Sequence, residues 1–249
     1  MATYNTFVFS GHGYSEVNKT TDPGAVNGSI TEANLAKQIR DVAKKYLDTV
    51  KLTVHYDENN YADNDLAGNT YTNKCGISIH INSAQGASGT EIFVPLKEKN
   101  LTADVNIAKK ISADLGIPNR GVKSRDYDSG YYIQRANGVA CTGTDYYKEI
   151  RDAWNRGISL AILEVGFIQN DLAKIQANIE DIGYMVAEYI GECCNVTIPA
   201  KVQPQASVIQ DDTFYRVVTG SFKDRAQAEK RIAELKAKGF DSFIAIYKK

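Results

Sequence analysis

Ile158-Ser-Leu-Ala-Ile-Leu-Glu-Val-Gly-Phe-Ile168 is an apolar run that carries one carboxylate, Glu164, near its end. A run of this length and composition predicts a buried strand. An ionised carboxylate in apolar surroundings is costly unless a cation or hydrogen-bond donors meet it. Glu164 is therefore the residue for which the sequence most clearly demands a functional partner.

Two other apolar runs end in a similar way, each on a histidine. Thr6-Phe-Val-Phe-Ser10 leads into His12, which lies between two glycines, and Gly76-Ile-Ser-Ile79 leads into His80. Three predicted strands thus deliver a metal-binding or proton-handling side chain at the same end. This pattern predicts a single functional site.

Apolar runs of this kind alternate with helical patterns over residues 1–195. The predicted strands are 5–10, 50–56, 75–81, 90–95, 131–134 and 158–166. The predicted helices are 31–48, 101–115, 145–155 and 173–194. This alternation predicts an α/β domain, a mostly parallel twisted sheet flanked by helices. Ligands of such sheets collect at the carboxyl ends of the strands, which is where His12, His80 and Glu164 fall.

The composition changes after residue 195. Residues 196–212 contain two of the five prolines and show no period, which indicates a linker. Residues 213–249 then predict a small C-terminal βαβ domain, with strands at 214–219 and 241–247 around a helix that begins at Asp224. A unit of this size is too small to bury a sufficient core alone. We therefore expect it to pair with a copy of itself or to pack on the larger domain.

Charge and hydropathy limit the partners of the chain. Its 249 residues are 43% hydrophobic and 24% charged, with a net charge of −1, which argues against general attraction to nucleic acid or membranes. Residues 213–249 hold nine Lys or Arg against four Asp or Glu, which suggests a separate docking role for this tail. No apolar run approaches the roughly 18 residues of a membrane span. The N-terminus lacks a secretory signal pattern, so we expect synthesis in the cytoplasm.

The candidate site residues are more informative together than singly. Alone, His12 could be a turn histidine, His80 a core histidine and Glu32 an ordinary glutamate in the first turn of a helix. Together, two imidazoles and one carboxylate with an open fourth position form the ligand set of a catalytic zinc site. Such a zinc ion activates a water molecule, and Glu164 would take the proton of that water. The remaining histidine, His55, is expected at the surface.

Five motifs carry a resemblance to a known family: Ser10-Gly-His-Gly13, the glutamate that opens the first helix, Ser78-Ile-His-Ile-Asn82, Arg120-Gly-Val-Lys123 and Leu163-Glu-Val-Gly-Phe-Ile-Gln-Asn170. Over roughly residues 5–192 the chain resembles zinc-dependent N-acetylmuramoyl-L-alanine amidases of the amidase-3 type. The resemblance implies one zinc ion and cleavage of the peptidoglycan amide between N-acetylmuramic acid and L-alanine.

The same resemblance assigns the site residues. It implies that His12, Glu32 and His80 are zinc ligands and that Glu164 is the general base. Glu16 is a second acidic residue in this region, and we prefer Glu32 because a helix start holds a side chain more rigidly than a loop. The sequence departs from the family pattern at His55, where an arginine often follows the second strand. Residues 134–157 also form a longer connection than usual.

The C-terminal tail resembles the sporulation-related repeat known as SPOR, through Tyr215-Arg-Val-Val-Thr-Gly-Ser-Phe-Lys-Asp-Arg-Ala-Gln-Ala-Glu229 and Leu235-Lys-Ala-Lys-Gly-Phe240. That family binds peptidoglycan, notably glycan strands that lack stem peptides. The match covers one βαβ unit where the family has two. We therefore expect a homodimer in which two chains supply the halves of one cell-wall-binding module.

The leading hypothesis is a peptidoglycan amidase, either a phage or prophage endolysin or a mother-cell lytic enzyme of a spore-former, that acts on the cell wall after release. A zinc carboxypeptidase-like peptidase is an alternative, because it needs the same zinc–water chemistry. A wall-binding adaptor without catalysis is another. Aromatic faces can stack on sugars, so a tyrosine cluster near the expected cleft is of interest, namely Tyr127, Tyr131, Tyr132, Tyr146 and Tyr147.

Overall fold

The computed structural model describes residues 2–15, 18–59, 66, 68–201, 220–240 and 242–245. The chain divides into two compact units, Met1–Lys201 and Val202–Lys249. Across the described residues, no helix combines the length and apolar character that a membrane span requires.

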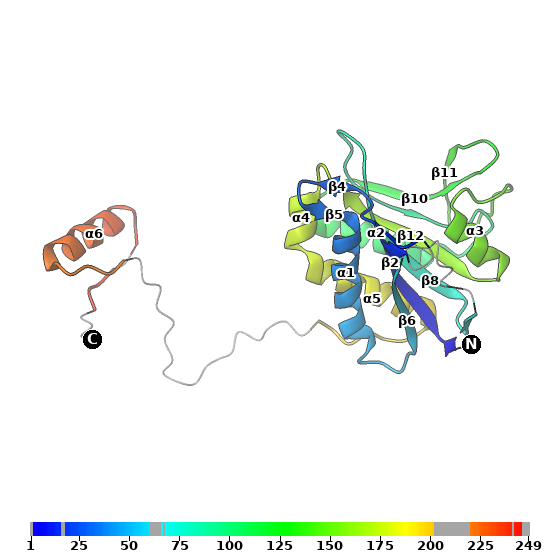
Figure 1. The fold of residues 1–249 in the computed structure, drawn as a ribbon, viewed down its shortest axis with the longest axis horizontal. Helices are drawn as coiled ribbons and strands as arrows, with labels where there is room; N and C mark the ends of the chain where they lie inside the picture. Colours follow the sequence, from blue (N-terminus) through cyan, green and yellow to red (C-terminus); the bar gives the residue numbers. More distant parts are fainter. Residues whose placement is uncertain are drawn as a thin grey trace. The chain divides into compact units, whose positions relative to one another are not determined.

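The first unit is built on an eight-stranded sheet (Figure 1). Its strands run in the order β11-β10-β9-β12-β8-β2-β3, and β6 also pairs with β2. Their bounds are β2 Thr6–Ser15, β3 Thr20–Asp22, β6 Val54–Asn59, β8 Cys75–Asn82, β9 Thr90–Phe93, β10 Asn119–Arg125, β11 Tyr132–Gln134 and β12 Ser159–Phe167. Two short pairs lie apart from this sheet, β1 Thr3–Tyr4 with β7 Thr70–Tyr71, and β4 Val26–Asn27 with β5 Ile30–Thr31.

The centre of the sheet is parallel. Strand β2 pairs in parallel with β6 and β8, β8 with β12, and β9 with β10. The pairs β9–β12, β10–β11 and β2–β3 are antiparallel. The carboxyl ends of β2, β8 and β12 consequently meet at one edge, as the sequence predicted.

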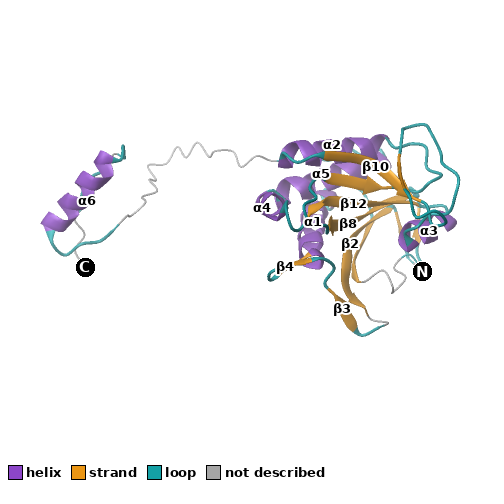
Figure 2. Cartoon of the chain, turned by 90° about the horizontal axis from the view of Figure 1, so that it is seen from above, coloured by secondary structure: helices purple, strands orange, loops and turns teal. Residues whose placement is uncertain are grey.

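The helices cover the two faces of the sheet unequally (Figures 1 and 2). Three long helices pack on one face, namely α1 Glu32–Leu47, α2 Thr102–Leu115 and α5 Ile179–Cys194, with the short α4 Leu172–Ala177 beside them. Among the described residues, a single short helix, α3 Lys148–Asn155, packs against β12 on the other face. The face that carries α3 therefore has less helix over it.

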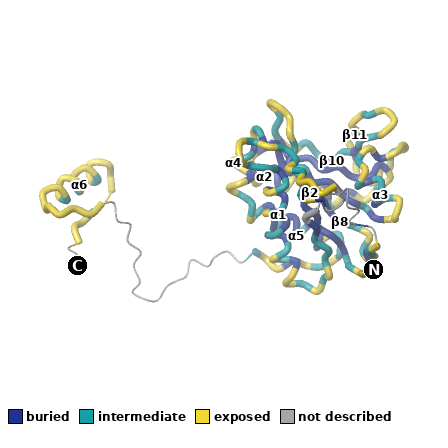
Figure 3. The backbone as a smooth tube through the Cα atoms, viewed as in Figure 1, coloured by how far each residue is buried: buried dark blue, intermediate teal, exposed yellow. Residues whose placement is uncertain are grey.

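Two apolar cores follow from the alternation of side chains along the strands. The larger core joins the sheet to α1, α2 and α5, and includes Ile79, Leu163 and Ile39. The smaller core lies under α3 and includes Phe9, Phe93 and Ile150. The strands and inner helix faces are buried in Figure 3.

The same alternation determines which polar side chains lie together on one face of the sheet. Glu164 of β12 is the register partner of His80 on β8 and of Glu91 on β9. Register partners point to the same face of a sheet. They alternate with the residues of the larger core, so all three side chains lie on the face that carries α3.

The predicted fold class is confirmed, as are most of its elements. The predicted helix 173–194 is in fact two helices, α4 and α5, because Asn178 leaves helical geometry and its side-chain amide donates to the carbonyl of Lys174. Strand β10 was not predicted, since Val122 is its only large apolar residue. The boundaries 1–195, 196–212 and 213–249 remain predictions, although Ile198, in the predicted linker, is buried in the larger core.

The second unit contains helix α6 Arg225–Ala237. It begins as predicted at Asp224, whose side chain accepts a hydrogen bond from the Ala226 amide. No residue of α6 is buried, and Figure 3 shows it exposed along most of its length. The predicted strand 214–219 lies outside the described residues. The expected strand 241–247 is not formed at residues 242–245, because the described part of this unit offers no strand to pair with.

Candidate metal centre and active site

Three side chains that are far apart in the sequence converge at the carboxyl edge of the sheet. The Oε1 atom of Glu32 lies 3.1 Å from His12 Nε2 and 3.0 Å from His80 Nδ1. One potential ligand atom from each residue lies within 4.8 Å of the others. The structure thus brings together the three residues that the sequence predicted as metal ligands.

Two glycines make this approach possible. A Cβ atom at Gly11 would lie 2.3 Å from the His80 ring, and a Cβ at Gly24 would lie 2.6 Å from both Glu32 and His12. Side chains at either position would displace the site residues. His12 itself has a φ of 64°, which is uncommon outside glycine and marks a specialised position in β2.

Glu32 is held rigidly at the start of α1. Thr31 caps this helix by accepting a hydrogen bond from the Asn34 amide. The carboxylate of Glu32 accepts backbone hydrogen bonds from Ala25 at 2.8 Å and from Ile81 at 3.0 Å. These bonds fix the carboxylate between the two imidazoles. The alternative acid, Glu16, lies outside the described residues.

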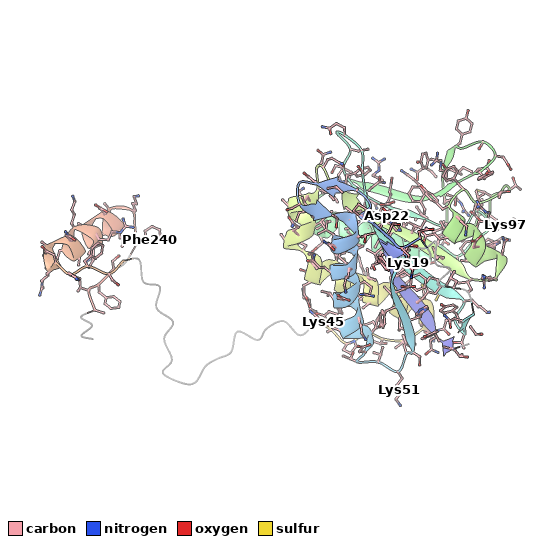
Figure 4. All side chains as sticks on the ribbon, viewed as in Figure 1. Lys19, Asp22, Lys45, Lys51, Lys97 and Phe240 are labelled. Carbon is pink, nitrogen blue, oxygen red and sulfur yellow. The ribbon has the colours of Figure 1, made fainter. Side chains whose placement is uncertain are left out.

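Further polar groups support the histidines from outside the trio. The carboxylate of Asp22, at the end of β3 (Figure 4), lies 2.8 Å from His12 Nδ1. The hydroxyl of Ser78 lies 3.1 Å from His80 Nε2, and Glu149 Oε1 lies 3.5 Å from the same nitrogen. Sequence reasoning missed both Asp22 and Glu149. The only signal for Glu149 was its place in the first turn of a predicted helix within the long connection 134–157.

The protonation of the trio reflects its own hydrogen bonds. Burial raises the pKa of Glu32, but the hydrogen bonds from His12 and His80 outweigh it and hold that pKa well below its usual range. Burial lowers the pKa of His80, yet hydrogen bonds to Glu149 and Glu32 raise it well above the ordinary value. The pKa of His12 is raised in the same way by Glu32. The trio is therefore held together by hydrogen bonds from the imidazoles to one ionised carboxylate, and a bound cation would replace these imidazole protons.

Glu164 lies beside this trio, because it is the register partner of His80. Its Oε2 atom is shielded from solvent and has no hydrogen-bond partner among the described residues. Burial raises the pKa of this carboxyl to about 8, although the neighbouring His80 opposes the shift. A buried acceptor without a partner requires an explanation, and a proton-transfer role supplies one.

His55 does not lie at the surface, contrary to the prediction. It is half-buried, its Nδ1 lies 2.7 Å from the Tyr71 hydroxyl, and its ring stacks on Tyr4 at 4.7 Å. Burial lowers its pKa. The apolar surroundings supplied by the short β1–β7 pair were not apparent from the sequence of its own strand.

Most of the tyrosine cluster is an exposed aromatic surface. Tyr127, Tyr131 and Tyr132 are 58%, 75% and 57% exposed. The guanidinium of Arg125 lies 4.7 Å from the ring of Tyr132 and 3.6 Å from that of Tyr146. This stacking holds the two rings in place beside strand β11.

Comparison with known proteins identifies the class. The family model for N-acetylmuramoyl-L-alanine amidase matches residues 7–192, so the chain belongs to this family. A second family model, the SPOR domain, matches residues 196–245. This second match includes the predicted linker as well as most of the predicted C-terminal unit.

Individual relatives agree with this assignment. The sporulation-specific N-acetylmuramoyl-L-alanine amidase of Bacillus subtilis is 24% identical over 251 residues, covering 96% of this chain and 84% of the relative. Cwp6 from Clostridium difficile has a similar fold, with a TM-score of 0.56, 21% identity and coverage of 76% of this chain, which spans only 29% of Cwp6. A structure from Neisseria meningitidis, described as a candidate N-acetylmuramoyl-L-alanine amidase, gives a TM-score of 0.50 and 20% identity over 78% of this chain and 98% of its own.

Family membership establishes the chain as a peptidoglycan amidase with an attached SPOR domain. Family membership favours an amidase over the non-catalytic adaptor and over the carboxypeptidase-like peptidase. The roles of individual residues are a separate question, which the geometry addresses.

Proposed function

We propose that the chain hydrolyses the amide between the lactyl group of N-acetylmuramic acid and L-alanine, using one zinc ion held by His12, Glu32 and His80. In this proposal Glu164 is the general base. The observation that carries it is the convergence of two imidazoles and a carboxylate within 4.8 Å, beside the carboxylate of Glu164, one oxygen of which is buried and unpaired among the described residues.

The donor set fits zinc. Two histidine nitrogens and one carboxylate oxygen form a common set for catalytic zinc, and three protein ligands leave a position for water or substrate. The hydrogen bond between Asp22 and His12 is the kind of outer contact that orients a metal-binding imidazole. When bound, zinc would polarise the substrate carbonyl and lower the pKa of a coordinated water.

Glu164 carries the proton of the attacking water to the leaving group. Glu164 accepts it at Oε2 and returns it to the nitrogen of the leaving L-alanine, so one carboxyl serves as base and then as acid. Burial favours the protonated form of Glu164, which suits a group that must hold a proton between these two transfers. A cation in the neighbouring trio favours the ionised form that must accept the proton first.

Metal analysis and product analysis on purified cell walls test the proposal together. We expect about one zinc per chain and release of new amino termini without new reducing sugar ends. Soluble fragments with reducing ends would indicate a glycosidase instead. Undiminished activity on peptides freed from their glycan would indicate a peptidase.

The cellular setting is also proposed. We infer a lytic enzyme that is made in the cytoplasm and acts on the wall after release. The endolysin role remains a prediction, and the name of the Bacillus subtilis relative favours the alternative of a lytic enzyme used in sporulation. Induction of the protein during sporulation, compared with induction during prophage excision, separates the two.

Dimerisation through the C-terminal unit also remains a prediction. The SPOR match covers 50 residues, more than the 37 residues from which a half-length unit was inferred. Sedimentation measures the oligomeric state, and a strict monomer that still binds glycan strands would contradict the dimer.

A further inference from the structure

A second polar site lies on the same face of the sheet, next to Glu164. It is a cavity of about 370 Å³ between the ends of β8, β9, β10 and β11. Its wall includes Asn82, Glu91, Arg120, Lys123, Tyr132 and Phe167. Two of these residues belong to the motif Arg120-Gly-Val-Lys123, to which the proposed mechanism gives no role.

The charges of this cavity are unbalanced. Glu91 Oε2 accepts hydrogen bonds from both Arg120 Nε, at 2.7 Å, and Lys123 Nζ. Its Oε1 accepts a third from the amide of Asn82 at 2.9 Å. One carboxylate thus faces two cations, which leaves one positive charge without a counter-charge in the group.

Burial makes this imbalance significant. The side chains of Glu91 and Lys123 are only 5% and 12% exposed, so water screens them poorly. Arg120 is 36% exposed and packs over the ring of Phe167. Within the described residues, its terminal Nη groups make no hydrogen bond, although a guanidinium can bind a carboxylate with two donors at once.

The position of the cavity relates it to the scissile bond. Glu91 is the direct register partner of Glu164 across the antiparallel β9–β12 pair. Side chains in such a pair lie roughly 5 Å apart at Cβ. In the proposed mechanism Glu164 returns a proton to the leaving amine, so the amine side of the substrate begins at Glu164. The next residue of the peptide then reaches this cavity.

We propose that Arg120 and Lys123 bind a free carboxylate on the stem peptide, on the residue that follows L-alanine. A ligand carboxylate brings the group to two cations and two anions and occupies the donors of Arg120. In peptidoglycan that residue is a glutamate linked through its side chain, and its α-carboxyl is either free or amidated. The inference rests on the proposed amidase function and adds a preference for the free acid.

Two soluble substrates test this preference, a muramoyl-L-Ala-γ-D-Glu with a free α-carboxylate and the same compound with an α-carboxamide. Hydrogen bonds to charged groups contribute more than neutral ones, so we expect kcat/KM to be about tenfold higher or more for the carboxylate, mainly through KM. Lys123→Met and Arg120→Gln should each reduce this ratio toward one. Lys97→Met removes an exposed lysine elsewhere (Figure 4) and should leave the ratio unchanged.

The ratio of kcat/KM for the acid to kcat/KM for the amide distinguishes ligand binding from a purely structural role of Glu91, Arg120 and Lys123. If the cluster only supports the fold, Lys123→Met lowers kcat/KM for both substrates by the same factor, which overturns the proposal. Equal kcat/KM values for the wild-type protein overturn it as well. Arg120→Gln gives a second reading at a more exposed position if Lys123→Met does not fold.

A binding measurement keeps this proposal distinct from the amidase function. Calorimetric titration of the wild-type protein with the two dipeptide products, acid and amide, does not require turnover. If neither substrate is cleaved, the amidase proposal fails, yet about tenfold tighter binding of the acid still supports the cavity. Equal binding, or none, rejects the carboxylate site.

Discussion

Glu164 and Asp104 are two acids whose pKa values burial raises, to about 8 and about 7 respectively. Asp104 lies in the first turn of α2 and accepts a hydrogen bond from the hydroxyl of Tyr189 on α5, at 3.1 Å. Glu164 lies at the carboxyl edge of the sheet, next to His80, and its Oε2 has no hydrogen-bond partner within the part of the chain that the structure describes. A raised pKa therefore does not identify a catalytic acid. What distinguishes Glu164 is its position beside His80 and the oxygen that has no hydrogen-bond partner among the described residues.

Glu91 provides a third case on the strand next to Glu164. It is as well buried as Asp104, but its oxygens accept hydrogen bonds from two cations and an amide. In our proposals the three buried acids thus have different roles: Glu164 transfers a proton, Glu91 positions Arg120 and Lys123, and Asp104 joins α2 to α5. Substitutions at these positions and at the metal ligands test whether the roles differ.

The largest effect is expected for Glu164→Gln. Turnover should fall by roughly 10²- to 10⁴-fold because the proton carrier is lost. The melting temperature should stay the same or rise, since a neutral amide replaces a carboxyl that is costly to ionise there. Rates on purified cell walls and a thermal melt of the same sample measure both. Turnover within a factor of a few of the wild-type value would remove Glu164 from the mechanism.

His12→Ala should reduce bound zinc from about one per chain to nearly none, because only two ligands remain. Elemental analysis after dialysis measures this stoichiometry. The matched control is His55→Gln, which changes a histidine that lies outside the trio and should leave the zinc content intact. Full metal content in His12→Ala would refute its assignment as a ligand.

Asp22→Asn should have a smaller effect on the same site. The amide cannot hold the His12 imidazole as the carboxylate does, and outer-shell changes of this kind typically cost about 10- to 100-fold in metal affinity. Competition with a chelator measures the affinity. An unchanged affinity would show that the 2.8 Å contact with His12 contributes nothing to binding.

Asp104→Asn should alter stability and leave activity unchanged. The pKa of Asp104 is raised above its ordinary value of 3.8 to about 7 in the folded protein. The folded state therefore binds this proton more tightly, and its stability falls as the pH rises from about 4 through 7. The variant should thus melt higher than the wild type at pH 8 and show little difference near pH 4. A constant difference across this range would contradict the assignment.

The sequence predicted the strands that hold the site because their apolar runs are continuous, and each ends on a functional residue. It predicted Glu32 through its place at a helix start. It could not predict Asp22, Glu149 or Glu91, whose partners are set by strand pairing and by the packing of α3. The error at His55 has the same origin, since a distant strand pair buries it.

The most direct test of the metal centre is an anomalous-scattering map from crystals of the protein grown with zinc. We expect one strong peak within about 2.0–2.2 Å of an atom from each of His12, Glu32 and His80, and close to Glu164. A peak bound by other residues, or no peak at a zinc concentration that supports activity, would contradict it.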